Sequence, residues 1–305
     1  MNTAAHPSRN RLVVGVDGSH QSNLALAWAA RIAMATGDEI DAVMAWHVPA
    51  SAGWGYTIPD WNPEADATRS LEEALDAAFP AGRPVGMRSL VREGGAAEVL
   101  LDASQGATML IVGSRGRDGF TGLLLGSVSA ACAEHASCPV LVVHGGEQAS
   151  GSESQPLRNR IVVGVDGSEQ SRLALARSTR IADATGAEID AVIACQDPAA
   201  ASLGYMYPEW DPQSEATKHL EEAVDAAFPA GRPIGMRLLV RPGGAAKVLL
   251  AESEGATMLI VGSRGYGGFT GLLLGSVSAA CAEHASCPVL VVHEGAPATA
   301  PVAAS

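Results

Sequence analysis

The amino-acid sequence is one module written twice, and this duplication limits the chain to two copies of the same fold. Position 9 aligns with position 158, and position 144 with position 293, without a gap and with most paired residues identical. A chain of 305 residues with 47% hydrophobic content can bury two ordinary cores. We therefore predict a domain at residues 9–144, a flexible linker rich in Gly, Ser and Glu at 145–157, and a second domain at 158–293.

Strand-like and helix-like segments alternate along each repeat. Short apolar runs predict five strands in the first repeat, at residues 11–17, 39–47, 85–91, 108–112 and 140–144. Helical spacing and turn signals predict helices at residues 21–35, 65–79, 96–103 and 127–136. This alternation predicts a parallel sheet with helices on both faces. The expected fold class is α/β, with two tandem, open, Rossmann-like domains of five parallel strands in the order 3-2-1-4-5.

Composition excludes several classes of partner and site. The net charge of −13 argues against a nucleic-acid partner, because phosphate backbones are bound by clustered Lys and Arg. The sequence has no apolar run of about 18 residues and begins with a short polar segment, so we expect no membrane span and a soluble cytoplasmic protein. The five cysteines lack the spacing of a zinc site and are expected to be small buried or half-buried residues.

A glycine frame follows the apolar run at residues 108–112. It reads Gly113-Ser-Arg-Gly116, nine residues and then Gly126-Ser127, and it recurs from Gly262 to Ser276. Glycine lets the main chain approach an anion closely, and a helix that begins at Ser127 directs its free N–H groups and dipole at negative charge. The hydroxyls of Ser127 and Ser129 can also donate to phosphate oxygens. The frame therefore predicts a phosphate site at the carboxyl ends of the strands, where Asp17 also lies.

Two structural explanations of the same residues remain open. The glycines can simply form a turn, with Ser127 as a helix cap, and Asp17 can cap the first helix.

Other nucleotide-binding loops do not fit the sequence. The lysine of a P-loop is missing, and the turn after the first strand is not the Gly-x-Gly-x-x-Gly turn of dinucleotide-binding domains.

The segments Val-Gly-Val-Asp-Gly-Ser, the glycine frame and the closing Cys-Pro-Val-Leu-Val-Val resemble the universal stress protein family. The resemblance is to its ATP-binding, tandem-domain branch, of the actinobacterial type, and covers both repeats. It implies one ATP site, with or without Mg²⁺, in each domain. In the first repeat the implied site residues are Gly15, Val16, Asp17, Val43, Gly113, Ser114, Arg115, Gly116, Arg117, Gly119, Gly126, Ser127, Val128 and Ser129. In the second they are Gly164, Val165, Asp166, Val192, Gly262, Ser263, Arg264, Gly265, Gly268, Gly275, Ser276, Val277 and Ser278.

The resemblance also implies how the two domains meet. The last strand of the first repeat, at 140–143, would pair with its equivalent at 289–292, and this pairing would cover both sheet edges. The two-domain chain is then expected to dimerise again. The repeats differ near the loop, where Arg117-Asp118 becomes Tyr266-Gly267, so a cation at position 117 would add phosphate affinity in the first site alone.

Histidines and aromatic residues supply further candidates. His135 and His284 are either acid–base groups or residues of a helix end, and the second role is favoured. His144 and His293 end the last strands and are expected to be solvated. Aromatic residues follow the second strand of each repeat. They either stack on the base of the nucleotide or only cover the surface of the domain: Trp54, Tyr56 and Trp61 in the first repeat, and Tyr205, Tyr207 and Trp210 in the second.

Three functions fit these patterns. The leading one is a regulatory ATP-binding protein of the stress response, in which ATP occupancy is a signal, because no base that could position a water is evident. The second is a slow Mg²⁺-dependent ATPase or phosphotransfer protein using Asp17 or Asp118. The third is an interaction protein whose nucleotide site has lost its role.

Overall fold

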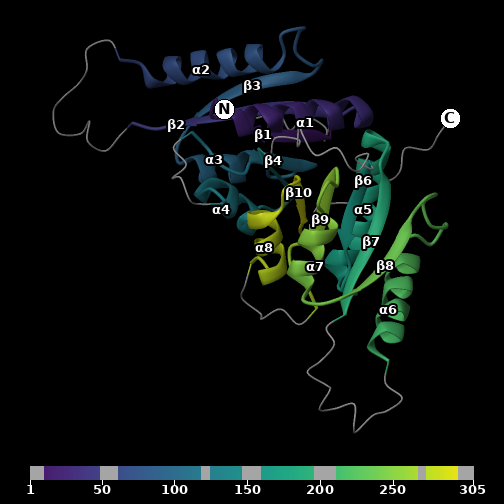
Figure 1. Ribbon diagram of the computed structural model, residues 1–305. Coiled ribbons are helices and arrows are strands. Elements are labelled where there is room, and N and C mark those ends of the chain that lie inside the picture. The colour runs from purple at the N-terminus through teal and green to yellow at the C-terminus, as the bar shows by residue number, and fades with distance from the viewer. Residues whose placement is uncertain are drawn as a thin grey trace, which may run out of the picture.

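The computed structural model describes residues 10–48, 61–117, 124–145, 159–195, 211–266 and 273–294. All the strands and helices predicted for the first repeat are present in order, and the second repeat matches them (Figure 1). The first repeat contains β1 (Arg11–Gly15), α1 (His20–Thr36), β2 (Glu39–Trp46), α2 (Pro63–Ala78), β3 (Met87–Glu93), α3 (Ala96–Ala103), β4 (Met109–Gly113), α4 (Ser127–His135) and β5 (Val140–Val143). The second contains β6 (Arg160–Gly164), α5 (Glu169–Thr185), β7 (Glu188–Cys195), α6 (Pro212–Ala227), β8 (Arg237–Pro242), α7 (Ala245–Glu252), β9 (Met258–Gly262), α8 (Ser276–His284) and β10 (Val289–Val292).

Local sequence sets the helix boundaries. Helix α1 begins after Ser19, whose side chain accepts a hydrogen bond from the N–H of Ser22, and it ends at Gly37 in the left-handed conformation. Helix α2 begins after Asn62, which caps the N–H of Ala65. These caps satisfy main-chain groups that the helix itself leaves unpaired.

Strand β3 is shifted by two residues from its predicted bounds of 85–91. Gly86 has a φ of 80°, and the N–H of Met87 donates to the carbonyl of Pro84 at 3.2 Å. Residues 84–87 therefore form a turn, which leaves the side chain of Val85 fully exposed. The apolar side chain of Val85 resembles the start of a strand, because the pattern of apolar residues does not show where the backbone turns.

Each repeat contributes five parallel strands. Strand β1 lies between β2 and β4, β2 also pairs with β3, and β4 pairs with β5, all in parallel. The order in the first repeat is thus β3-β2-β1-β4-β5, and the predicted order 3-2-1-4-5 is confirmed. Because β1 and β4 are neighbours, their carboxyl ends and the loops that follow them lie at the same edge of the sheet.

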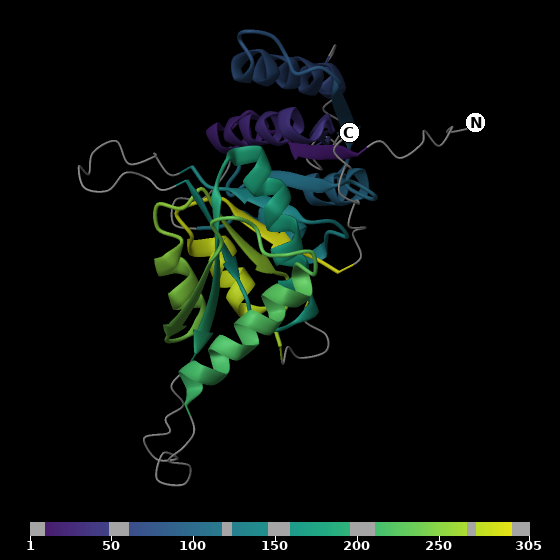
Figure 2. The ribbon, with the colours of Figure 1, turned by 90° about the vertical axis from the view of Figure 1, so that its right-hand side faces the viewer.

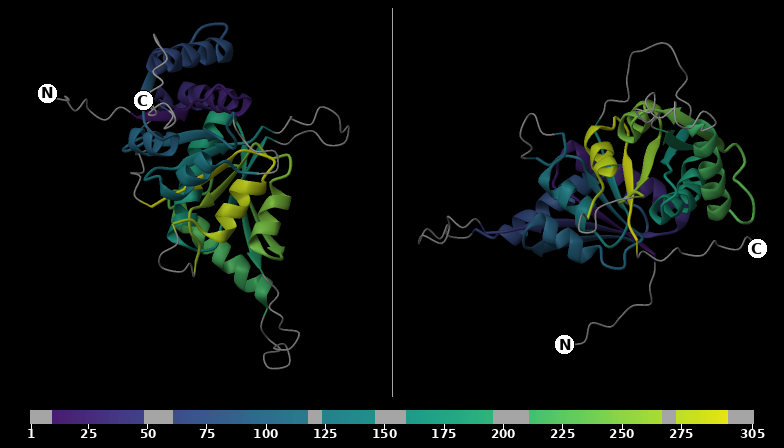
Figure 3. Two further views of the ribbon diagram at one scale, coloured as in Figure 1. Left: turned by 90° about the vertical axis from the view of Figure 1, so that its left-hand side faces the viewer. Right: turned by 90° about the horizontal axis from the view of Figure 1, so that it is seen from below.

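The two five-stranded sheets join into one sheet of ten strands. Strands β5 and β10 pair antiparallel, with Leu141 opposite Leu290, and every residue of both strands is buried. The expected pairing of the closing strands is therefore confirmed. The views from the sides and from below show the first repeat, purple to teal, lying next to the second repeat, teal to yellow (Figures 2 and 3). Strands β5 and β10 thus cover each other's edges within one chain, and β3 and β8 are the edge strands of the joined sheet.

The core consists of apolar layers on the two faces of this sheet. One layer is continuous across both repeats, and includes Leu26 from α1, Leu141 from β5 and Leu175 from α5. On the other face each repeat has its own cluster, and the two leucines Leu125 and Leu274 pack against both of them. The segments that lead into α4 and α8 are thus held by both repeats. Within the residues described, no helix combines the length and apolar character needed to span a membrane.

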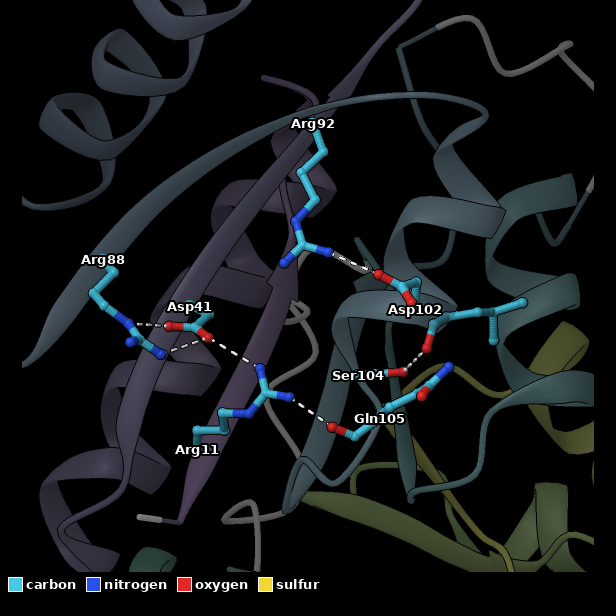
Figure 4. A network of polar contacts seen from close by, with 8 residues as sticks. Arg11, Asp41, Arg88, Arg92, Asp102, Ser104 and Gln105 are labelled. Atoms are coloured by element: carbon cyan, nitrogen blue, oxygen red, sulfur yellow. Dashed lines mark hydrogen bonds and ion pairs between the residues drawn. The ribbon is translucent and has the colours of Figure 1, made fainter. Parts of the chain in front are cut away.

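Buried carboxylates link the first three strands of each repeat. Asp41 on β2 accepts hydrogen bonds from Arg88 on β3, at 2.7 and 2.9 Å, and from Arg11 on β1 at 3.1 Å (Figure 4). Arg11 also donates to the carbonyl of Gln105 at 2.6 Å. In the second repeat, Asp190 occupies the corresponding position. These arginines are engaged in structural ion pairs at the strand starts, away from the glycine frame.

The cysteines are buried, as predicted. Burial raises the pKa of the Cys132 thiol to about 12 and that of Cys287 to about 11. A thiol that stays protonated is a poor nucleophile and a poor metal ligand, which leaves these cysteines with a packing role.

Candidate functional site

Asp17 and the glycine frame meet at the carboxyl edge of the sheet. Asp17 follows β1, whereas the frame begins at Gly113 on the neighbouring strand β4. The Asp17 carboxylate joins the two loops: Oδ1 accepts the N–H of Ser19 at 2.9 Å, and Oδ2 accepts the N–H of Arg117 at 2.9 Å. The cap of α1 is Ser19, so Asp17 is not the helix cap that the alternative explanation required.

The second repeat repeats this arrangement around Asp166. Its Oδ1 accepts the N–H of Ser168 at 3.0 Å, and its Oδ2 accepts the N–H of Tyr266 at 2.8 Å. A Cβ atom at Gly265 would lie 2.5 Å from Oδ2 of Asp166, and one at Gly116 would lie 2.7 Å from Oδ2 of Asp17. A larger residue at either position would have to displace the carboxylate, because the loop passes directly over it.

Ser114 anchors the phosphate loop from below. Its N–H donates to the carbonyl of Val143 on β5 at 2.7 Å, and its own carbonyl accepts the N–H of Gly126 at 2.7 Å. Ser263 makes the same two bonds in the second repeat. Both serines are about 2% exposed, so they support the loop and do not line its outer surface. Gly119 and Gly268 lie outside the described residues.

Helices α4 and α8 begin without a side-chain cap. Their N-cap residues are Gly126 and Gly275, and among the described residues no side chain accepts a hydrogen bond at either N-cap. Ser127 is the first helical residue and is exposed, so the alternative that made it the cap is wrong. An uncapped N-terminus leaves N–H donors and the positive end of the helix dipole directed at the loop, which favours an anion.

Ser129 is used differently from the expectation. Its hydroxyl donates to the carbonyl of Gly113 at 2.6 Å, and Ser278 donates to Gly262 at 2.5 Å. Each side chain is buried and its single proton is already engaged, so it braces the loop against the helix instead of donating to a phosphate. The sequence shows a hydroxyl near the frame but not which acceptor it selects.

A cavity of about 440 Å³ opens beside the loop of the second repeat. From the residues predicted for that site, those that line it are Gly164, Val165, Asp166, Val192, Gly262, Arg264, Gly265, Gly275, Ser276, Val277 and Ser278. Ser171, Ala194, Ala245, Leu249, Val261 and Tyr266 also line it and were not predicted. The cavity thus has a polar rim of loop residues and an apolar floor.

The apolar floor escaped the sequence analysis because its residues resemble ordinary core. Leu249 lies on α7 at a helical core position, and Ala194 lies on β7. The floor is packed closely, since a Cβ atom at Gly164 would lie 2.8 Å from Leu249. The first repeat has the same packing, with Gly15 and Leu100 in the corresponding positions and a matching distance of 2.9 Å.

The comparisons with known proteins match both repeats. A model of the universal stress protein family matches residues 8–144 and again residues 158–293. The chain belongs to the universal stress protein family. A universal stress protein of Mycolicibacterium smegmatis is 33% identical, with 92% of this chain and 96% of that protein covered. A universal stress protein of Mycobacterium tuberculosis is 30% identical, with 93% of this chain and 96% of that protein covered.

A solved structure supports the fold of this tandem universal stress protein. The universal stress protein from Archaeoglobus fulgidus covers 94% of this chain and 99% of its own, with a TM-score of 0.63 and 21% sequence identity. The match extends over both repeats, so the fold of the two-repeat chain has a counterpart in a solved structure.

Of the strand-end histidines of this family member, His293 is buried and His144 is half-buried, so the expectation that they are solvated is wrong. Nε2 of His144 lies 2.9 Å from the carbonyl oxygen of Ala282 in α8, and Nε2 of His293 lies 2.9 Å from that of Ala133 in α4. Each histidine therefore contacts the helix of the opposite repeat. Burial lowers the pKa of both imidazoles.

The remaining candidates lie further from the loop or outside the described residues. His135 and His284 end helices α4 and α8, in agreement with the favoured helix-end role. Trp61 precedes α2 with 39% of its surface exposed. Trp54, Tyr56, Tyr205, Tyr207 and Trp210 are outside the described residues, so their role as a cover for the base stays a prediction.

Proposed function

We propose that the chain is an ATP-binding universal stress protein that acts in the cytoplasm as a regulatory nucleotide sensor, with one site in each repeat. The observation that carries this proposal is the cavity of about 440 Å³ in the second repeat, which joins an uncapped helix N-terminus to an apolar floor. The uncapped helix N-terminus suits a chain of phosphates, and the apolar floor suits a flat base. The cavity volume lies within the usual range of small-molecule sites, about 300–1,000 Å³.

Each part of the site has a role in this proposal. The main chain from Gly262 to Gly265 and the start of α8 would bind the phosphates. Val165 and Val192 would contact the adenine, with Leu249 below it. Asp166 would face the ribose, since a carboxylate oxygen that accepts one N–H can accept a further donor. The first repeat offers the corresponding groups at positions 113–116, 16, 43, 100 and 17.

A sensor is favoured over a fast enzyme because the Asp17 and Asp166 carboxylates are engaged. Both oxygens of each accept main-chain N–H groups that hold the loop in place. Among the described residues, no group of three His, Cys, Asp or Glu side chains could hold a metal ion. Mg²⁺, if required, would therefore arrive with the phosphates, whose oxygens it prefers. Slow Mg²⁺-dependent hydrolysis or phosphotransfer is the alternative outcome of the test below.

The test uses the exposed serines at the two helix starts. Nucleotide released from the purified protein is identified by mass spectrometry, and ATP binding is measured by calorimetry. Ser127→Asp together with Ser276→Asp places a carboxylate where phosphate would bind, while acidic residues in a first helical turn favour folding. We expect ATP affinity to fall at least about tenfold, whereas the matched Ser→Asn pair retains it.

Two results would overturn parts of the proposal. Absence of ATP binding by the unmodified protein, with no rise in melting temperature on adding ATP, would reject the nucleotide site. ATP turnover over hours that disappears in Asp17→Ala, while binding persists, would replace the sensor with the enzyme.

We also propose that the two-domain chain forms a dimer. Strands β5 and β10 already pair with each other, so a contact between chains needs a different surface. Light scattering on the purified protein, with and without ATP, tests this part separately.

A further inference from the structure

Glu294 lies beside the phosphate loop of the second site. It follows the end of β10, and its Oε2 lies 3.1 Å from Nη2 of Arg264, a residue that lines the cavity. Its Oε1 accepts a hydrogen bond from Nε2 of Gln170 at 2.5 Å. Gln170 in turn packs on the loop, since a Cβ atom at Gly262 would lie 2.6 Å from its Cβ. The carboxylate is thus held in place next to the groups proposed to bind phosphate.

The first site has no side chain at the equivalent position. The residue that corresponds to Glu294 is Gly145, and Gln21 corresponds to Gln170. A Cβ atom at Gly145 would lie 3.1 Å from Nε2 of Gln21, so the glutamine occupies the same place in both sites. Arg115, the counterpart of Arg264, is exposed, and no ion pair to it is found within the described ranges.

The two loops also differ in sequence, where Arg117-Asp118 is replaced by Tyr266-Gly267. Tyr266 is 86% exposed. Counting charged side chains in the sequence of each loop, the first site has two arginines, Arg115 and Arg117, and two aspartates, Asp17 and Asp118. The second has one arginine and two carboxylates, Asp166 and Glu294. The charges of the first loop therefore cancel, whereas the second loop carries a net negative charge because of Glu294, although their main chains make the same hydrogen bonds.

We infer that the two sites differ in the nucleotide charge that they accept, and that Glu294 is the main residue that sets the difference. The first site selects a nucleoside triphosphate, and the second prefers a nucleotide with fewer phosphate charges. This inference rests on the proposed nucleotide function. The physical reason is that each added phosphate charge is attracted by a free guanidinium and repelled by a fixed carboxylate.

The experiment measures ATP and AMP binding at one site at a time in the full chain. Ser127→Asp blocks the first site and reports on the second, and Ser276→Asp does the reverse. In the Ser127→Asp protein, we expect Glu294→Gly to strengthen ATP binding about tenfold and AMP binding by less. In the Ser276→Asp protein, we expect the reciprocal Gly145→Glu to weaken ATP binding about tenfold.

A second variant separates charge from shape. Glu294→Gln keeps the size of the side chain and an acceptor for Gln170 but removes the charge, so it should shift the ratio of ATP to AMP affinity as Glu294→Gly does. An unchanged ratio in both variants, or a change in Glu294→Gly alone, would overturn the inference. Both results require that nucleotide binds, so they differ from failure of the proposed function, in which the unmodified protein binds neither ATP nor AMP. Melting temperatures without nucleotide verify that each variant is folded.

Discussion

His293 at the end of the second repeat lies 2.9 Å, through its Nε2 atom, from the main-chain oxygen of Ala133 in helix α4 of the first repeat. His144 makes the reciprocal contact with Ala282 in α8. The strand residue before each histidine accepts the N–H of a loop serine, Val292 from Ser263 and Val143 from Ser114. The junction between the repeats is therefore directly connected to both phosphate loops.

Acid should weaken this junction. Burial lowers the pKa of His144 and His293 below the usual 6.5, and the nearby guanidiniums of Arg115 and Arg264 act in the same direction. The unfolded chain then binds protons that the folded protein does not, so stability is complete above about pH 6.5 and is lost as the pH falls below it. We expect the free energy of unfolding, measured by urea denaturation, to fall between about pH 7 and pH 5.

Two variants identify the histidines responsible. In His144→Gln combined with His293→Gln, an amide can still donate to the carbonyl but does not titrate, and the slope of stability against pH should become smaller. His135→Gln, at the partly exposed end of α4, is the matched control and should keep the slope. A double variant with the slope of the unmodified protein would contradict the prediction.

A second inter-repeat contact is asymmetric. Nη2 of Arg180 on α5 lies 2.8 and 2.9 Å from the oxygens of Asp38, whose side chain is fully buried. The equivalents of these two residues are Arg31 and Ala187, and Arg31 instead stacks 4.4 Å from the ring centre of Trp28. Arg180→Met should leave a buried carboxylate without this partner and destabilise the protein by about 2–4 kcal/mol.

Arg31→Met is the matched control, because it removes the same charge from the same position of the other repeat. Its expected cost is about 0.5–1 kcal/mol, the usual size of an exposed cation–π contact. Urea denaturation of both variants measures the difference. Equal costs would show that the Asp38 contact contributes little to stability.

The parts of the fold that could be predicted from sequence are those set within a short stretch of chain. The apolar runs before Asp17 and Gly113 predict two strands and the loops that follow them. The duplication predicts the same elements in the second repeat. The partial burial of His144 depends instead on a strand from the other repeat pairing antiparallel with β5. That contact joins residues far apart in sequence, so a histidine after an apolar run was assigned to solvent.

The candidate site shows the same limit. The frame located the loop, but the contact between Arg264 and Glu294 joins the ends of β9 and β10, which only the sheet order brings together. The hydroxyl of Ser129 had two acceptors available in principle, a bound phosphate or the Gly113 carbonyl, and residue type does not choose between them. Leu249 is a core leucine that also lines the cavity, so its residue type and spacing do not distinguish it from the rest of the core.

The β5–β10 pairing should depend on its central leucines. Leu141 is fully buried opposite Leu290 and belongs to the layer that extends across both repeats. Leu141→Ala should cost about 2–5 kcal/mol in unfolding free energy, from lost burial and the cavity left behind. Leu124→Ala, with the side chain 52% exposed, should change stability by less than about 0.5 kcal/mol. A small effect at Leu141 would argue that the repeats stand without this pairing.

The cysteines provide a direct test of how tightly the core is closed. All five are buried, and burial raises the pKa of Cys132 and of Cys281 to about 12, so these two thiols are almost entirely protonated at neutral pH. Reaction with a thiol reagent should therefore be slow in the native protein and rapid once urea unfolds it, because labelling needs both thiolate and access. Mass spectrometry of the protein at successive times counts the labelled thiols and so gives the labelling rate in the native and in the unfolded state. Cys132 and Cys281 should react at similar rates, since they occupy equivalent positions in α4 and α8. Rapid labelling of either one in the native protein would show that its helix opens independently of the junction that His144 and His293 connect.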